Sequence, residues 1–282
     1  LNQIYQSISG LNTKNLKVSF DVSNFSGAAE LRYPLRHNIT SNGSYVFYGV
    51  GDLNRIQFEA LSGSTTSFSI DNVSVKEVGQ NWTLGTGWSI GDDKAVATNA
   101  TGNLLQTNVF TIGKTYKIVY TINEVTSGNG VRVKCGSTNG IVRNTDGTYV
   151  EYLTCTGSAH LFIDPNISFT GSVTNISVKE VGQDWTFGGG WSMGDGVSEC
   201  DSTPSSYLGQ EGVILTTNLY RLTFQARLKT GTNGTVTALI GGSNSNQFTI
   251  ADTNWQTFTY ENTRLPSTQT GVYFNNDGNE IE

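Results

Sequence analysis

Apolar and polar residues alternate along short stretches of the chain, and clusters of Gly, Asn and Ser separate these stretches. Three of them align with one another: LKVSFDVSNFSGAAELRY from Leu16, YKIVYTINEVTSGNGVRV from Tyr116 and YRLTFQARLKTGTNGTVT from Tyr220. Each predicts a strand, a tight turn and a second strand, which is the pattern of a β-hairpin. No amphipathic helical pattern of about ten or more residues occurs. The patterning therefore predicts an all-β protein.

A 21-residue block occurs twice. It is NVSVKEVGQNWTLGTGWSIGD from Asn72 and NISVKEVGQDWTFGGGWSMGD from Asn175, with five changes. Another shared strand is GSYVFYGV from Gly43, GTYVEYLT from Gly147 and NWQTFTY from Asn254. Self-similarity at a period of about 103 residues is too long for a solenoid and is typical of tandem globular domains.

The repeat register predicts three domains, over residues 1–79, 80–181 and 182–282. The first lacks a counterpart of NWTLGTGWSIGD, and the third stops at NEIE, before a counterpart of SVKEV. Because the sequence also lacks an initiator Met, we expect it to be a window from a longer polypeptide. About seven to nine short strands per domain predict tandem antiparallel β-sandwiches of the jelly-roll kind.

Composition narrows the function classes. Charged residues are 14% of the 282 residues, against roughly 25% in an ordinary soluble domain. The net charge of -6 is mild and no Lys/Arg run exists, so we expect no nucleic-acid partner. No apolar run approaches the roughly 18–20 residues of a membrane span, so we expect no membrane insertion.

The repeated motifs resemble a known family. The W-T-x-G-x-G-W-S-x-G-D opening and the I-D-N-V-S-V-K-E-V finish are similar to repeats in tail- and head-fibre proteins of bacteriophages. Those repeats in turn look like the jelly-roll carbohydrate-binding modules appended to glycoside hydrolases. The resemblance implies a non-catalytic appendage segment at the virion surface, with other virion subunits, further copies of itself and cell-surface polysaccharide as partners. Two alternatives stay open: a bacterial extracellular adhesin or filament, and the accessory modules of a glycoside hydrolase.

The sequence gives no support for catalysis. Its two histidines, His37 and His160, lie in different repeats with different neighbours. Glycoside hydrolysis needs two carboxylates at a set separation, and no pair of acidic residues recurs between the repeats. The glutamates that do recur, Glu77 and Glu180, each follow a lysine in the closing strand. We therefore expect no enzyme and no catalytic residues.

Three cysteines are too few for a disulfide scaffold. Cys135 and Cys155 share the middle repeat, which leaves two alternatives: a bridge between them, or two buried thiols. No Cys/His spacing typical of a metal site is present.

Tryptophans are the residues that sugar binding would need on the surface. Trp82, Leu84, Trp88 and Ile90 share one parity of a predicted opening strand, with small or polar residues on the other, which is typical of a strand with one buried face. We therefore expect these tryptophans in the core rather than on a ligand platform. The same expectation applies to three further residues: Trp185, Trp191 and Trp255. In the shared strand that starts at Gly43, Gly147 and Asn254, Trp255 aligns with Tyr45 and Tyr149. The residues of the opposite parity in this strand are candidates for an exposed strip: Tyr48, Tyr152 and Phe258.

Ligand specificity is expected where the repeats differ, because loops on rigid sandwiches carry function. The divergent segments are YPLRHNITSNG, CGSTNGIVRNTDG and GGSNSNQFTIADTN. Their polar residues are the candidate ligand-binding set, with unconstrained loop variation as the alternative. The set is Arg36, His37, Asn38, Arg143, Asn144, Asp146, Asn244, Asn246 and Gln247.

Some modules of the resembled type hold a structural Ca²⁺ near the two chain ends. The corresponding candidate ligands are Asp71, Asp92, Asp93 and Asp195. Ca²⁺ takes about six to eight oxygens, so two aspartates per repeat give it little support, and solvated turn residues are the alternative. No other cofactor is expected.

Overall fold

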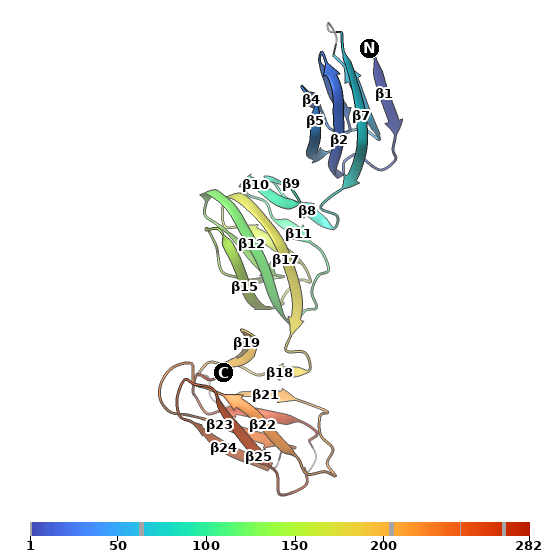
Figure 1. Cartoon of the computed structure of the whole chain (residues 1–282). Helices are drawn as coiled ribbons and strands as arrows, with labels where there is room; N and C mark the ends of the chain where they lie inside the picture. The colour runs from blue at the N-terminus through green and yellow to red at the C-terminus, as the bar shows by residue number, and fades with distance from the viewer. Residues whose placement is uncertain (1, 62–64, 203–205, 243, 267–268) are drawn as a thin grey trace. The chain divides into compact units, whose positions relative to one another are not determined.

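The computed structural model describes residues 2–61, 65–202, 206–242, 244–266 and 269–282. Within these residues the chain forms twenty-six strands and no helix (Figure 1). The paired strands are antiparallel, and the sheets pack over hydrophobic cores. The prediction of an all-β, antiparallel sandwich fold is therefore confirmed. No helix in the described part of the chain could cross a membrane.

Two compact units make up the chain. One consists of Leu1–Gly113 and Ile118–Val178, and the other of Lys114–Lys117 and Lys179–Glu282. The three-domain division at 79/80 and 181/182 stays a prediction, although the sheets repeat three times along the chain.

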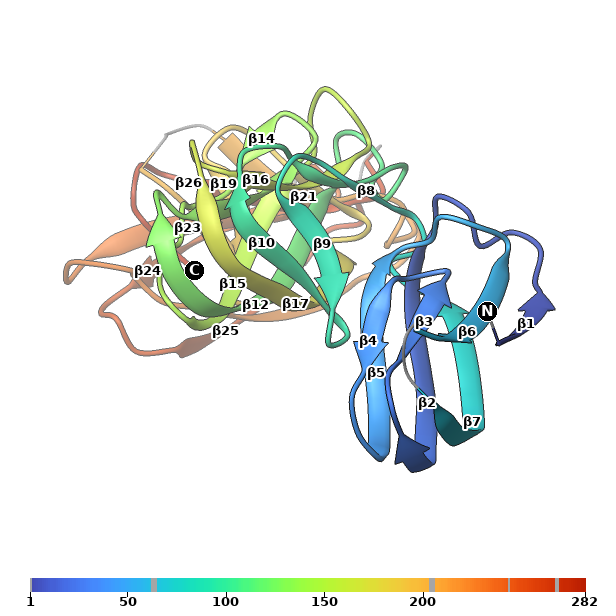
Figure 2. The ribbon, with the colours of Figure 1, turned by 90° about the horizontal axis from the view of Figure 1, so that it is seen from above.

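The first repeat contains two sheets. Four strands have the order β1-β6-β3-β4, with bounds Gln3–Ser7, Arg55–Ala60, Ala29–Tyr33 and His37–Ile39. Three strands have the order β5-β2-β7, with bounds Gly43–Val50, Asn15–Ser26 and Ser67–Glu77. The two layers can be followed in Figure 2.

The second repeat contains two five-stranded sheets. One has the order β14-β13-β16-β11-β8, with bounds Thr138–Asn139, Val131–Cys135, Leu161–Pro165, Leu104–Gln106 and Trp82–Leu84. The other has the order β15-β12-β17-β10-β9, with bounds Gly147–Thr154, Thr115–Gly128, Phe169–Val181, Lys94–Ala100 and Trp88–Gly91.

The third repeat keeps one sheet of five strands. Its order is β18-β21-β26-β23-β24, with bounds Trp185–Phe187, Ser206–Gln210, Val272–Asn276, Gly234–Ile240 and Asn244–Ile250. Two separate pairs complete it, β22 with β25 and β19 with β20, with bounds Arg221–Ala226, Gln256–Glu261, Trp191–Gly194 and Val197–Cys200. The same order in successive repeats shows that the sequence repeat is also a repeat of topology.

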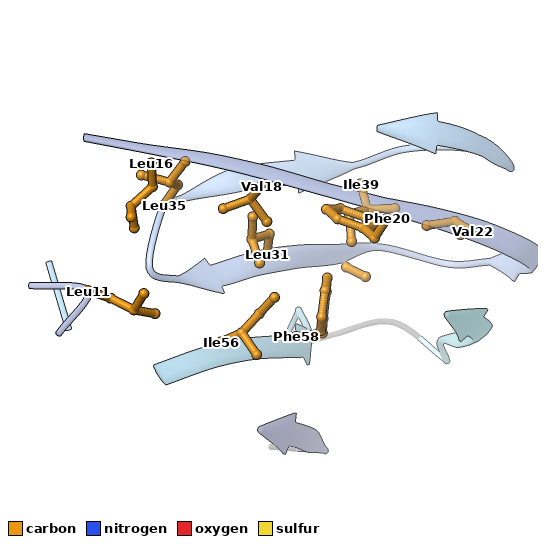
Figure 3. Packing of buried hydrophobic residues seen from close by; sticks show 11 residues of the cluster. Leu11, Leu16, Val18, Phe20, Val22, Leu31, Leu35, Ile39, Ile56 and Phe58 are labelled. Atoms are coloured by element: carbon orange, nitrogen blue, oxygen red, sulfur yellow. The ribbon is translucent and has the colours of Figure 1, made fainter. Parts of the chain in front are cut away.

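Strand alternation builds the first core. Alternate residues of β2, from Leu16 to Val22, are at most 4% exposed and point toward the facing sheet (Figure 3). Leu31 of β3 and Phe58 of β6 point back toward them. Phe20 meets Phe58 edge to face at 4.9 Å between ring centroids. Period-two burial is the expected result of a pleated strand with one face on a core.

The opening segment of the second repeat corrects one prediction. Trp82 and Trp88 lie on two strands of two different sheets, β8 and β9, rather than on one strand. Gly87, at φ 87°, lies where the chain passes from β8 in one sheet to β9 in the other. A Cβ at this position would collide with the backbone of Ala100. Trp88 is 7% exposed and its Nε1–H donates to the Gly102 carbonyl at 2.8 Å, which confirms its place in the core.

The remaining tryptophans separate into three groups. Trp191 is 9% exposed, as predicted for a core residue, whereas Trp82 and Trp185 are half-buried. The core prediction for Trp255 is wrong, because it precedes β25 and is 42% exposed. Its ring instead meets the Arg227 guanidinium at 4.7 Å.

The predicted exposed strip also needs correction. Phe258 packs on the third core and stacks on Phe224 at 5.4 Å. Tyr48 and Tyr152 are half-buried. The alignment of the third repeat was displaced by three residues, because Phe258 pairs with Phe224 where Tyr45 pairs with Phe20. A displacement by an odd number of residues exchanges the two faces of a strand.

Candidate functional site

The outer face of the β1-β6-β3-β4 sheet carries an unusual set of polar side chains. In β6, Ile56 and Phe58 point into the core, so Arg55, Gln57 and Glu59 point to the outer face. In β3 the same alternation places Glu30 and Arg32 on this side. Tyr5 of β1 lies opposite Gln57. We call this surface the Gln57 face, made of Tyr5, Glu30, Arg32, Tyr33, Arg55, Gln57 and Glu59.

Two carboxylates lie at its centre. Glu30 is opposite Glu59, and the two residues are 2% and 8% exposed. One guanidinium nitrogen of Arg32 contacts both, at 2.8 Å from Glu30 Oε1 and 3.7 Å from Glu59 Oε1. Arg36 Nε donates to the second oxygen of Glu30 at 3.2 Å. Such pairing is what a buried carboxylate requires to remain charged.

The two arginines determine the charge state of Glu30. Burial by itself would raise the pKa of this carboxyl, but hydrogen bonds from Arg32 and Arg36 outweigh it, and the pKa is lowered. Glu30 is therefore an ionised acceptor rather than a proton donor.

Gln57 is 2% exposed and only partly satisfied. Its Nε2 donates to Gln3 Oε1 at 2.8 Å and to Glu59 Oε2 at 2.9 Å. Both partner atoms are oxygens that accept, so the amide nitrogen of Gln57 faces them. Its carbonyl oxygen has no hydrogen-bond partner within the described part of the chain. A buried acceptor without a partner costs about 1–3 kcal/mol, so this atom would gain from a donor. Because the atom is buried, a donor from outside reaches it only when the side chains that cover it move.

An aromatic surface adjoins this acceptor. The Arg55 guanidinium lies 4.5 Å from the Tyr33 ring centroid and 5.7 Å from that of Tyr5. Tyr5 is 57% exposed. Amphipathic rings of this kind offer a flat apolar surface with a polar edge. The Gln57 face thus combines an open aromatic ring with unused hydrogen-bonding capacity.

On the equivalent face of the second repeat, the charged side chains pair with one another. Arg132 and Asp164 form an ion pair across β13 and β16, with nitrogens 3.0 and 2.9 Å from Asp164 Oδ2. Lys134 lies 5.6 Å from the Phe162 ring centroid. The polar groups of this face thus bind one another.

The third repeat has tyrosines at the same place. Tyr207 is 44% exposed and meets Tyr273 edge to face at 5.9 Å. Burial, and then the neighbouring carboxylate of Glu211, raise the pKa of Tyr273 to about 12, and its hydroxyl donates to Glu211. Gln247 Nε2 donates to Asp277 at 2.9 Å.

The predicted residues of the first loop are split between two faces. Arg36 reaches the Gln57 face through Glu30, and the exposed Asn38 pairs with Glu30 across β3 and β4. His37 turns inward and stacks on Phe47, with ring centroids 4.0 Å apart and planes within 2°. Burial lowers the pKa of His37.

The predicted residues of the other two loops lie in the second and third repeats. Arg143 pairs with the buried Glu151 at 3.2 Å. Asp146 accepts from the backbone amides of Glu124 and Val125, and Asn144 is exposed. In β24, Asn246 is exposed and Gln247 binds Asp277, while the side chain of Asn244 lies outside the described part.

The residues of β1 and β6, and most of those of β3, lie in regular strands, outside the divergent loops. The signal was present in the stretch RIQFEA, where three polar residues occupy the outward parity of a strand whose inward parity is Ile and Phe. Their burial on the outer face comes from neighbouring strands, which local sequence does not show.

The candidate metal ligands have ordinary structural roles. Asp92 and Asp93, at φ 48° and 59°, form the two-residue turn between β9 and β10, because Gly91 pairs with Lys94. Positive φ at both positions is the type I′ hairpin geometry. Asp195 is in the matching turn between β19 and β20, and the Asp71 carboxylate accepts from the next backbone amide. No cluster of three or more His, Cys, Asp or Glu that could hold a metal occurs among the described residues.

The three cysteines are free and buried. Burial raises the pKa of Cys135 and raises that of Cys200 to about 11. Of the two alternatives from the sequence, the structure has the buried thiols.

Comparisons with known proteins are limited. No family model and no curated protein matches the chain. Among solved structures, it is similar to the N-terminal CBM22-1-CBM22-2 tandem domain of Xyn10C from Paenibacillus barcinonensis, with a TM-score of 0.30 and 10% sequence identity. The match covers 72% of this chain and 91% of that chain. At this TM-score the likeness carries no argument about function.

Proposed function

We propose that the chain is a non-catalytic series of β-sandwich modules, and that its first repeat binds a neutral glycan on the Gln57 face. The observation that carries the proposal is the buried, unpartnered carbonyl oxygen of Gln57 beside the exposed ring of Tyr5. Sugar rings present apolar C–H faces that stack on aromatic planes, and hydroxyl groups that donate to such acceptors.

Charge on this face favours a neutral ligand. Glu30 already binds two arginines, and Arg32 also contacts Glu59, so these four residues balance their own charges. The remaining cation, Arg55, lies over the rings of Tyr33 and Tyr5. A charged ligand would have to displace one of these ion pairs or draw Arg55 away from these rings. A neutral polyhydroxylated ligand can stack on Tyr5 while every ion pair stays intact, and its hydroxyls can reach the Gln57 oxygen when the side chains that cover it move.

The carboxylate pair does not suit glycoside hydrolysis. A general acid needs a pKa near the working pH, whereas that of Glu30 is lowered. Glycosidase carboxyls must also face the scissile bond, and the oxygens of Glu30 are occupied by Arg32 and Arg36. These features support binding without catalysis.

The setting of these modules is a separate proposal. A virion appendage with other virion subunits as partners rests on the sequence resemblance alone. A bacterial adhesin and the accessory modules of a glycoside hydrolase stay as alternatives. The glycan contact is common to all three settings.

The test is binding of neutral glycans to the purified chain. An array of neutral oligosaccharides, followed by calorimetric titration of the best ligand, should give a Kd below about 1 mM. Tyr5→Ala should weaken it about tenfold or more, because the exposed ring is lost. Tyr48→Ala is the matched control, since it removes a tyrosine from the outer face of the other sheet of the same repeat. No binding below about 1 mM, or equal loss in both variants, would show that the Gln57 face is not a glycan site.

A further inference from the structure

The second repeat has a cavity of about 510 Å³ between its two five-stranded sheets. Four residues that are at most 8% exposed form its floor: Ala95 of β10, Leu104 of β11, Leu161 of β16 and Val173 of β17. Two of these strands belong to each sheet, so the cavity reaches the interior of the sandwich. The strands around it can be followed in Figure 1.

The course of β10 leaves this space open. Ala95 of β10 pairs with Val173 of β17, and β10 begins only one residue earlier, at Lys94. The residues of β17 after Thr174 therefore have no partner in β10. The cavity lies beside this part of β17, where the sheet lacks a neighbouring strand on one side.

A bulge turns the next residues of β17 toward the same space. Asn175 has φ 51°, and its counterpart Asn72 has φ 54° at a place where β7 has one residue more than β2. An extra residue of this kind reverses the parity of the residues that follow it. Val173, Ile176 and Val178 therefore line the cavity together, and the last two are only half-buried.

Polar and aromatic side chains lie where the lining reaches the surface. Trp82 of β8 and Gln106 of β11 lie opposite each other in register, and both are half-buried. Asn175 of β17 is exposed on the side of the other sheet. The cavity thus has an apolar interior, and its mouth carries one indole and two amides.

We propose that this cavity binds a small neutral molecule with an apolar body and a hydroxyl end. Its volume lies within the roughly 300–1,000 Å³ of ligand sites, and the buried floor and the Trp82 ring offer contacts to the body. Amides both donate and accept, so Gln106 and Asn175 suit the hydroxyl. The two charges at the mouth, on the adjacent Asp93 and Lys94, have opposite signs, which favours a ligand without net charge.

A sugar suits this cavity poorly. Its ring carries hydroxyls on most carbons, and those that face Leu104, Leu161 and Val173 would lose water without gaining a hydrogen bond. The cavity therefore takes a different class of ligand from the Gln57 face. The proposal is independent of the glycan contact.

The test is titration of the purified chain with straight-chain primary alcohols from butanol to octanol. The Kd should fall about fourfold with each added CH₂ group, because each buries more apolar surface. The fall should stop at the length that fills the cavity. The methyl resonances of Leu104, Leu161 and Val173 should shift on binding, because these side chains form the floor.

Variants that fill the cavity identify the site. Val109→Trp should weaken binding about tenfold or more, because Val109 is a half-buried residue of the lining. Ile176→Trp fills the cavity from β17, so the result does not depend on the folding of one variant. Val150→Trp is the matched control and should leave the Kd unchanged, since Val150 is 41% exposed on β15 and does not line the cavity.

Three results would overturn the proposal. In the first, no alcohol shifts the three methyl resonances up to its solubility limit. In the second, the Kd falls with every added CH₂ group and all three variants bind alike, which is adsorption to the surface. In the third, a neutral sugar shifts these resonances at lower concentration than any of the alcohols.

Discussion

Glu30 and Glu59 lie opposite each other on neighbouring strands, and the guanidinium of Arg32 contacts both carboxylates. Like charges directly opposite each other destabilise a sheet, so a shared cation is the condition for placing both here. The arrangement is buried on the outer face rather than in the sandwich core. It therefore ties the order of the proposed binding face to the stability of the first repeat.

Removal of the Arg32 side chain should destabilise the first repeat. Arg32→Ala leaves two buried carboxylates facing each other, and we expect the free energy of unfolding of the first repeat to fall by about 2–4 kcal/mol. Arg36→Ala is the matched control, because Arg36 also binds Glu30 but its side chain is 64% exposed, and its loss should cost under about 1 kcal/mol. Denaturant unfolding measures both. Equal costs would contradict the bridging role of Arg32.

Acid should weaken the first repeat through Glu30. The folded-state pKa of Glu30 is lowered, so its contribution is complete above the ordinary value of about 4.3 and is lost as pH falls through the folded value. Glu30→Gln should flatten the pH dependence of stability below about pH 4.3. Glu261→Gln, in an exposed ion pair with Arg221, should leave the curve unchanged. Unfolding curves between about pH 2 and 6 decide this, and a Glu30→Gln curve as steep as the parent's would refute it.

Much of the architecture could be predicted from the sequence. Strand alternation marks the hairpins, and the doubled block marks the repeat, because both are local or linear signals. The expected faces of Trp255 and Phe258 were exchanged because the third repeat was aligned three residues out of register, and an odd displacement inverts a strand. Trp82 and Trp88 separated into two sheets because Gly87 adopts a backbone that the alternation pattern cannot show.

The candidate site was harder to predict. Loop divergence pointed to Arg36 and Asn38, which lie at the margin of the Gln57 face. Gln57 itself is in a regular strand, and its importance comes from register: Tyr5 lies opposite it, and Glu59 binds its amide. Such long-range pairing depends on strand order, which a single sequence does not contain.

Calcium removal should have no effect on stability. Asp92, Asp93 and Asp195 already serve as residues of two-residue hairpin turns with positive φ. We expect the thermal midpoint to be the same in excess chelator and in about 1 mM CaCl₂, because a bound ion would stabilise the folded state by mass action. A rise of the midpoint with calcium would show a site that these turns do not reveal.

The thiols should be unreactive until the protein unfolds. Burial raises the pKa of Cys200 to about 11, so at pH 8 only about one molecule in a thousand carries the thiolate. Cys135 has a raised pKa for the same reason. A thiol-specific disulfide reagent should label none of the three cysteines rapidly in buffer, and all three in denaturant. Labelling of only one in denaturant would reveal a disulfide between the other two.

Replacement of Trp88 should lower the free energy of unfolding much more than replacement of Trp255. Trp88 is buried and donates to Gly102, so Trp88→Ala should lower the free energy of unfolding by about 3–5 kcal/mol through a cavity and an unpaired carbonyl. Trp255 is 42% exposed and its ring meets Arg227, so Trp255→Ala should cost under about 1 kcal/mol. Chemical denaturation measures the two losses, and fluorescence quenching by acrylamide should be stronger for Trp255. A loss at Trp255 as large as that at Trp88 would place it in a core after all.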